Sequence, residues 1–173
     1  VGIFYAFKLD FLHLNFKEMI KSFIMDFETA NEKGINLIAQ KYGYMMESTA
    51  PQRFKVIKKQ LMPVSEEKRA IIEQIVAIQV GFMEEFASAY PLSAGNARSI
   101  HTSEDHLYNT SYETYLRGEI STYSEKTLML YATPRFYLIG ITTKSLFHQS
   151  TLTAIKNIFT FTFITTAPKH PSL

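Results

Sequence analysis

The chain has 173 residues, a formal net charge of +2 and a composition that is 46% hydrophobic and 20% charged. A chain of this length suits one domain that buries about two thirds of its surface on folding. The small net charge gives no support to a nucleic-acid partner. The lack of cysteine excludes disulfides, thiolate nucleophiles and cysteine-bound metals. No apolar run reaches the ~18 residues of a membrane span and no signal peptide is present, so we expect a cytoplasmic protein with no membrane partner.

The first predicted element is an amphipathic helix over residues 12–27. Its apolar side chains, among them Phe16, Phe23 and Phe27, recur at helical spacing, and charged residues occupy the positions between them. Gly34 follows as a natural left-handed stop. The spacing therefore predicts a helix with one apolar face.

Two shorter helices are expected next. Residues 36–47 carry apolar side chains at helical spacing, and a third helix follows the stretch STAPQRF. In that stretch Thr49 and Gln52 have the spacing of a capping box, and Pro51 is tolerated in a first turn. This third helix is expected to end before Pro63.

The widest apolar stripe lies in residues 65–90, which predicts a helix packed by several neighbours and closed by Pro91. Residues 92–109 are polar and are predicted to form a long loop, a feature that is often functional. In the segment after it, Thr110 is the expected cap of a helix, with Glu113 as its capping-box partner. Ser124 is the expected cap of the next helix.

The predicted architecture is mainly α, a single-domain bundle of about five helices. Residues 1–15 are expected to be a divergent N-terminal segment and residues 16–132 the helical domain. Residues 126–173 contain no aspartate or glutamate, and the stretch IFTFTFITT alternates with a period of two. We therefore expect residues 133–173 to form an irregular tail or a short hairpin.

One pair of side chains in the segment after the loop has a spacing with chemical meaning. Glu113 and Arg117 are four residues apart with the glutamate first, which places both on one helix face. They form either an exposed ion pair or an anion clamp in which Glu113 orients the guanidinium. Gly118 indicates close packing or close approach of a ligand. Arg98 and Tyr115 are the further ligand-binding candidates.

The loop holds a cluster of titratable residues, His101, Glu104, Asp105 and His106. Oxygen and imidazole ligands suit a divalent metal, but the chain has no spaced metal motif, so we predict no metal and leave the cofactor open. Asp105, His101 and His106 are the catalytic candidates, because a histidine or a carboxylate serves as a general acid or base.

Three stretches carry a resemblance to a known family: SFIMDFETANEKGINLIAQKYGYMMESTAP, IEQIVAIQVGFMEEFASAYP and TSYETYLRGEISTYSEKTLMLY. Over roughly residues 16–131 the chain resembles an uncharacterised bacterial family, domain of unknown function 4125. The resemblance implies a mainly helical domain and assigns no catalytic role to any residue. The motif positions that it carries over are Arg98, Glu104, Asp105, Thr110, Ser111, Glu113, Tyr115, Arg117, Gly118, Glu119 and Tyr123.

The two ends depart from that family. Its members carry an upstream cysteine-containing segment that this chain lacks, and Ile35 stands where they tend to have arginine. We therefore consider three hypotheses. The leading one is a site for an anionic small molecule, with acid–base candidates, between residues 92–109 and residues 110–120. The alternatives are a non-enzymatic helical interaction module and a truncated or frame-shifted copy without function.

Overall fold

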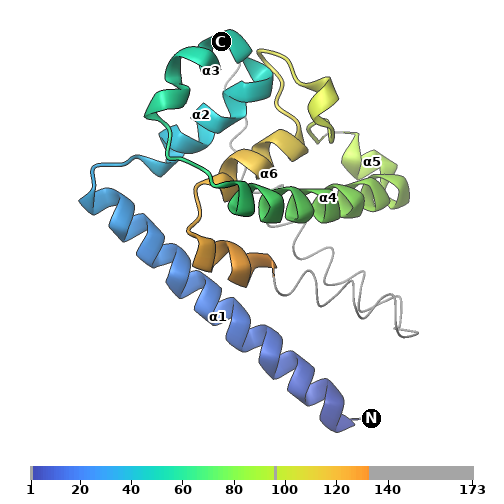
Figure 1. The fold of residues 1–173 in the computed structure, drawn as a ribbon. Helices are drawn as coiled ribbons and strands as arrows, with labels where there is room; N and C mark the ends of the chain where they lie inside the picture. The colour runs from blue at the N-terminus through green and yellow to red at the C-terminus, as the bar shows by residue number, and fades with distance from the viewer. Residues whose placement is uncertain (1, 96, 133–173) are drawn as a thin grey trace.

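The computed structural model describes residues 2–95 and 97–132, with side chains from Leu14 onward. Its helices are α1 (Gly2–Glu32), α2 (Leu37–Thr49), α3 (Pro51–Ile57), η1 (Lys58–Gln60), α4 (Glu66–Ala89), α5 (Pro91–Ala94), η2 (Thr102–Glu104) and α6 (Tyr112–Ser121) (Figure 1). Residues 125–132 are also helical. No strand occurs within these ranges, where His106 and Asn109 form an isolated bridge. The predicted mainly α class is confirmed, while the predicted β-containing tail lies outside the described residues.

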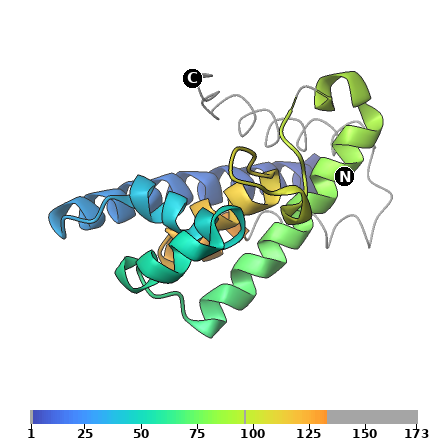
Figure 2. The ribbon, with the colours of Figure 1, turned by 90° about the horizontal axis from the view of Figure 1, so that it is seen from above.

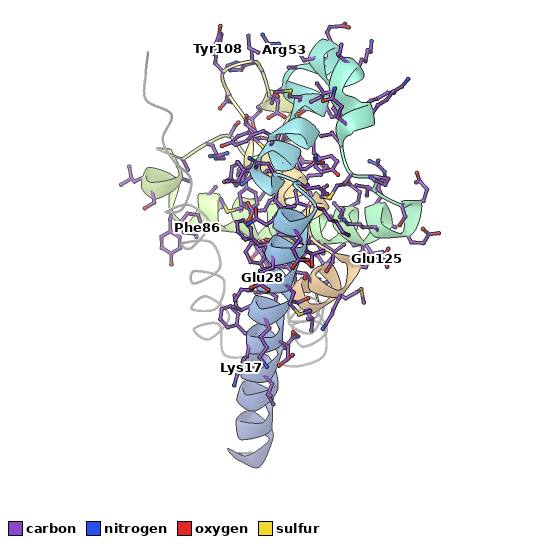
Figure 3. All side chains as sticks on the ribbon, turned by 90° about the vertical axis from the view of Figure 1, so that its left-hand side faces the viewer. Lys17, Glu28, Arg53, Phe86, Tyr108 and Glu125 are labelled. Carbon is purple, nitrogen blue, oxygen red and sulfur yellow. The ribbon has the colours of Figure 1, made fainter. Side chains whose placement is uncertain are left out.

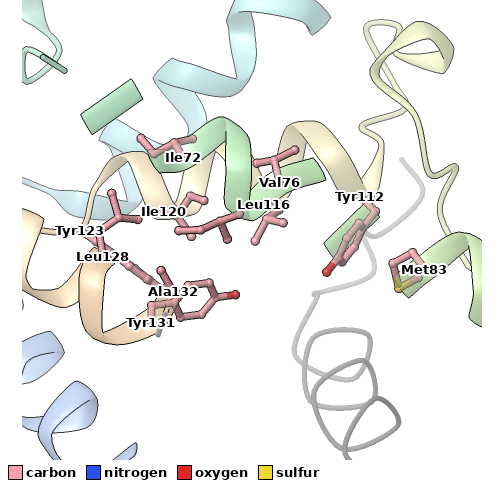
Figure 4. Close-up of a cluster of buried hydrophobic side chains, with 11 residues drawn as sticks. Ile72, Val76, Met83, Tyr112, Leu116, Ile120, Tyr123, Leu128, Tyr131 and Ala132 are labelled. Carbon is pink, nitrogen blue, oxygen red and sulfur yellow. The ribbon is translucent and has the colours of Figure 1, made fainter. Parts of the chain in front are cut away.

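The main core forms where α4 and α6 meet the helical segment 125–132 (Figure 4). Its buried side chains are Ile72, Ile75, Val76, Met83, Tyr112, Leu116, Ile120, Tyr123, Leu128, Tyr131 and Ala132. Burying each large apolar side chain contributes roughly 1.5–3 kcal/mol. Gln79 of α4 is also buried, and its Oε1 accepts a hydrogen bond of 3.0 Å from the Tyr112 hydroxyl. The amide thus satisfies the tyrosine hydroxyl inside the core.

α6 lies between α2 and α4, so it is covered on two sides (Figures 1 and 2). Gly118 allows the contact with α2. A Cβ atom at this position would lie 2.6 Å from Met45 Cγ and 3.0 Å from the carbonyl oxygen of Lys41. Of the two expectations for Gly118, the structure therefore shows close helix packing.

The predicted cap of α3 is wrong by one residue. The helix begins after Ala50, which makes no side-chain cap, and Pro51 occupies its first turn as expected. The Thr49 hydroxyl instead donates 3.0 Å back to the Met45 carbonyl, inside the last turn of α2. Threonine near a helix end often makes this backward bond, which removes it from the capping role.

The predicted cap of α6 is also wrong by one residue. Ser111, not Thr110, is the N-cap, and its hydroxyl accepts 3.2 Å from the backbone N–H of Thr114. Glu113 is not a capping-box partner, because its carboxylate accepts from Thr102 N and from Arg117. For the helix over 125–132 the expected cap is confirmed, since Ser124 Oγ accepts 3.2 Å from Thr127 N.

α1 is longer than expected and packs by an unexpected face. From Leu14 onward its buried side chains are Asn15, Ser22 and Ala30, all small or polar, and Met19 beside them packs half-buried against the main core. Ser22 Oγ accepts 2.7 Å from the Thr127 hydroxyl, which fixes α1 to the segment 125–132. Helix α1 ends where Gly34 adopts a φ of 67°, as the sequence predicts. Figure 3 shows the N-terminal half of α1, around Lys17, extending beyond the other described helices.

Residues 92–109 are less irregular than expected. α5 begins at Pro91, directly after α4, and η2 forms a second helical turn. A tight turn follows, closed by mutual backbone bonds of 3.0 Å between His106 and Asn109. Among the described helices none has the length and apolar character needed to cross a membrane.

Candidate functional site

Arg117 lies at the centre of a charge network. Its Nε and one terminal nitrogen bind both oxygens of Glu73, at 2.9 and 3.0 Å, and the same terminal nitrogen reaches Glu113 at 2.8 Å. The other terminal nitrogen donates 3.3 Å to the Thr102 hydroxyl. Burial lowers the pKa of Arg117, but the bonds to the two glutamates outweigh it and raise the pKa above its usual value.

The predicted pair of Glu113 and Arg117 is therefore present, but the carboxylates of Glu73 and Glu113 together already neutralise the Arg117 guanidinium. Burial alone would raise the pKa of Glu113. The hydrogen bonds from the Thr102 N–H and from Arg117 have a larger effect in the opposite direction, so the pKa lies below the ordinary value. A guanidinium bound by two carboxylates has little remaining charge to offer a ligand. The geometry favours a structural clamp between α4 and α6 over an anion clamp.

Asp105 connects three elements of the fold. Its carboxylate accepts from the hydroxyls of Ser48 on α2 and Thr114 on α6, at 2.5 and 2.6 Å, and from the Ser111 N–H at 2.7 Å. Burial raises the pKa of Asp105, but these three donors together lower it below the usual value. Thr102 extends the cluster, with its hydroxyl 2.9 Å from that of Thr114. A carboxylate stabilised in its ionised form is a weak base.

The structure separates Arg98 from Arg117. Arg98 stacks over the ring of Tyr115 at 4.5 Å, and Lys41 lies over the same ring at 3.5 Å. Lys41 also binds Glu119 at 2.6 Å. The three side chains form a cation–π stack on the face of α6 nearest α2 and the loop. Arg117 lines a cavity with α2, α3 and α4, whereas Arg98 lines a smaller one beside Met83 and Phe86 of α4.

Among the described contacts, neither candidate histidine forms a hydrogen bond with Asp105. His101 Nε2 is 3.2 Å from Glu84 on α4, and His106 is exposed at the turn, where its Nδ1 accepts 3.4 Å from the Tyr108 N–H. Within the part of the chain that the structure describes, no three His, Asp or Glu side chains gather in a way that could hold a metal ion. The polar cluster in the sequence is thus dispersed in space.

An open cavity adjoins both the Asp105 cluster and Arg117. A cavity of about 890 Å³ lies between α2, α3 with η1, the first half of α4, and α6. This volume is within the range of small-molecule sites. Apolar side chains such as Phe54, Leu61 and Val64 line part of it, and Ser48, Thr114 and other members of the Asp105 cluster line another part.

Three cations line this cavity without a partner of their own. Lys58 and Lys59 come from η1 and Arg69 from the first turns of α4. No side-chain hydrogen bond or ion pair joins any of them to another described residue. The lining acids are Glu47 and Glu73, and Glu73 is already bound to Arg117. The cavity therefore carries a positive excess that the fold does not neutralise.

The outer wall of the cavity is held firmly. Tyr44 of α2 donates its hydroxyl to the Met62 carbonyl at 2.5 Å, and Gln40 accepts 2.8 Å from the Met62 N–H. Burial raises the pKa of Tyr44 to about 12, so the hydroxyl stays protonated at neutral pH. The link between η1 and α4 is thereby fixed to α2, which holds this wall of the cavity in place.

Sequence reasoning missed this cavity. The sequence predicted a site between the polar loop and residues 110–120, and from that region Thr102, Thr114 and Arg117 form only one wall of the cavity. Only the basic run KVIKK signals the cations, because their position opposite Arg69 depends on how η1 packs against α4.

One known family matches nearly all of the residues that the structure describes. The family model described as "Protein of unknown function (DUF4125)" matches residues 8–136, three quarters of the chain. The chain belongs to this family. The DUF4125 match starts earlier and ends later than the 16–131 expected from the sequence. A search of curated proteins and a search of solved structures each returned no match.

Proposed function

We propose that this DUF4125 protein binds a small organic anion in the cavity between α2, η1, α4 and α6. The observation that carries the proposal is the set of three cations, Lys58, Lys59 and Arg69, that line a cavity of about 890 Å³ and make no ion pair with another described residue. A cleft lined by charge of one sign concentrates ligands of the opposite sign. The ligand class is the one expected from the sequence, but most of the cavity wall comes from α2, α3, η1 and α4, and only Thr102 and residues of α6 belong to the region expected from the sequence.

The lining also limits the ligand's shape. Phe54, Leu61 and Ile72 offer apolar contact, and the hydroxyl of Ser48 lies at the polar end. A bare inorganic ion would leave most of this wall uncovered, whereas an anion with an apolar body would bury it at about 25 cal/mol per Å². The favoured ligand is therefore a carboxylate or phosphate ester with a hydrocarbon or aromatic part.

Asp105 has a positioning role in this proposal. It holds Ser48 and Thr114 in place from behind, and its ionised state is stabilised by three donors. We assign it no proton transfer. Arg117 likewise holds α6 to α4 through Glu73 and contributes a wall of the cavity rather than a free charge.

The test is calorimetric titration and thermal shift of the full chain with alkyl and aryl carboxylates and phosphates, at constant ionic strength. A ligand that binds only the folded state raises the melting temperature. Arg69→Gln removes one exposed lining charge, worth about 1 kcal/mol at a solvated contact, so binding should weaken about fivefold.

Lys55→Gln is the matched control, because Lys55 is exposed on α3 and does not line the cavity. Its affinity for the same ligand should stay unchanged. Equal weakening in both variants would indicate general screening of charge. The absence of any shift across the whole ligand set would leave the cavity without its proposed role.

A further inference from the structure

Helix α1 carries an apolar stripe that the contacts within the described chain leave half-exposed. Its helical spacing places five large side chains on one face, next to the small and polar face that packs on the body. They are 39–51% exposed and comprise Phe16, Ile20, Phe23, Ile24 and Phe27. Within the described residues, only Phe23 makes a ring contact, with Tyr123 at 5.5 Å between centroids.

The exposed apolar area of the stripe equals that of the largest patch on a typical monomer. Five side chains of this kind at roughly half exposure present on the order of 450 Å² of apolar area. The largest apolar patch on a typical monomer is about 300–600 Å² and is often functional. Single exposed apolar residues need no explanation, but a continuous stripe on one helix does.

The spacing of the stripe fits pairing with an identical helix. Phe16, Ile20, Phe23 and Phe27 are separated by four, three and four residues, which is the alternation of a coiled-coil seam. Such a seam is complementary to itself, and two-fold pairing of identical chains is the commonest form of protein assembly. Phe16, next to Lys17, lies where α1 begins to extend beyond the other described helices, and the other three side chains continue the stripe along the half of α1 that packs on the body (Figure 3).

We propose that two copies of the chain form a two-fold dimer in which their α1 helices pack along this stripe. The apolar area supplies about half of the ~800 Å² per partner that a standard interface buries. Lys17, which follows Phe16 at the neighbouring position of the helix, would form part of the rim. The interface is separate from the cavity between α2, η1, α4 and α6.

The chain offers a direct test because it contains no cysteine. Single variants Phe16→Cys, Ile20→Cys and Phe27→Cys can form a disulfide only between two chains. Mild oxidation should yield a covalent dimer at all three positions if the helices are parallel, or at the position nearest the axis if they are antiparallel. Leu92→Cys, which is 90% exposed on α5 and distant in sequence, is the control that should stay uncrosslinked.

Light scattering on the unmodified chain gives the second measurement. The mass should be twice that of one chain and fall toward one chain on dilution. Ile20→Lys with Phe27→Lys should abolish the dimer while leaving the helical circular dichroism unchanged, and Leu92→Lys should have no effect. A chain that is monomeric at every concentration, or equal crosslinking at Leu92 and at the stripe, overturns the proposal. The stripe would then be covered by something other than a second copy.

Discussion

At the residue scale, a small change at Asp105 should lower the free energy of unfolding strongly. Three donors converge on its carboxylate from α2, from α6 and from the backbone before α6. Asp105→Asn keeps the shape but turns one acceptor into a donor, so one donor loses its partner. Bonds to a charged acceptor contribute about 1.5–3 kcal/mol, and we expect unfolding free energy to fall by about 2 kcal/mol in urea titrations. The neighbouring His106→Asn, at an exposed site, should change it little.

The same carboxylate gives this effect a pH dependence. The pKa of Asp105 is lower in the folded chain than its unfolded value of about 3.9. Its contribution to stability is therefore complete above about pH 5 and is lost as the pH falls through the folded-state pKa. The stability gap between the natural chain and Asp105→Asn should narrow on acidification from pH 7 to pH 3. A gap that is constant over this range would contradict a role for the ionised form.

Residue-level prediction from sequence succeeded where the partners are close in the chain. The i, i+4 spacing identified the pair of Glu113 and Arg117. It could not identify Glu73, the second partner of Arg117, because that residue lies 44 positions away. Ligand binding by Arg117 and acid–base catalysis by Asp105 were expected from their charges alone. In the structure the charge of Arg117 is bound by Glu73 and Glu113, and that of Asp105 by donors from Ser48, Ser111 and Thr114.

At the scale of elements, the contact between α2 and α6 depends on one missing methyl group. Gly118→Ala would place Cβ 3.0 Å from the Lys41 carbonyl oxygen and still closer to Met45. Strain of this kind costs typically 1–3 kcal/mol, which exceeds the helix propensity that alanine gains. We expect a lower melting temperature. Gly81→Ala in α4 is the matched control, since nothing lies within 4 Å of its Cβ position, and it should stabilise the chain by up to about 1 kcal/mol. A stable Gly118→Ala variant would show that α2 can move away from α6.

Helix positions were predictable from periodicity, and helix starts were less so. The stripe of α4 and the stops at Gly34 and Pro91 follow from local sequence. Adjacent hydroxyl residues such as Thr110 and Ser111 fit the same capping pattern, and tertiary contacts decide between them. Here Glu113 is drawn to Arg117 and Thr102, which leaves Ser111 as the cap.

At the scale of the whole molecule, the class of the fold was predictable and the cavity was not. Helical periodicity and the lack of strong strand patterns in residues 12–131 give a mainly α domain. The cavity requires the relative placement of η1 and α4, which no pattern within one element contains. The amphipathic character of α1 was correctly expected, but a single sequence cannot show whether an apolar face meets the same chain or another one.

The two faces of α1 lead to a prediction about how the molecule comes apart. α4, α6 and the segment 125–132 share the apolar core, whereas α1 joins them through Ser22, Ala30 and the half-buried Met19, and from Leu14 onward it buries no large apolar side chain fully. Sections of a protein with few buried apolar contacts open at lower free energy than its core. In hydrogen exchange under increasing urea, amides of α1 should open before those of α6, and dilution should lower the protection of α1 if it pairs with a second chain. A single opening free energy for α1 and α6 at all protein concentrations would instead place α1 within the same cooperative unit as the core.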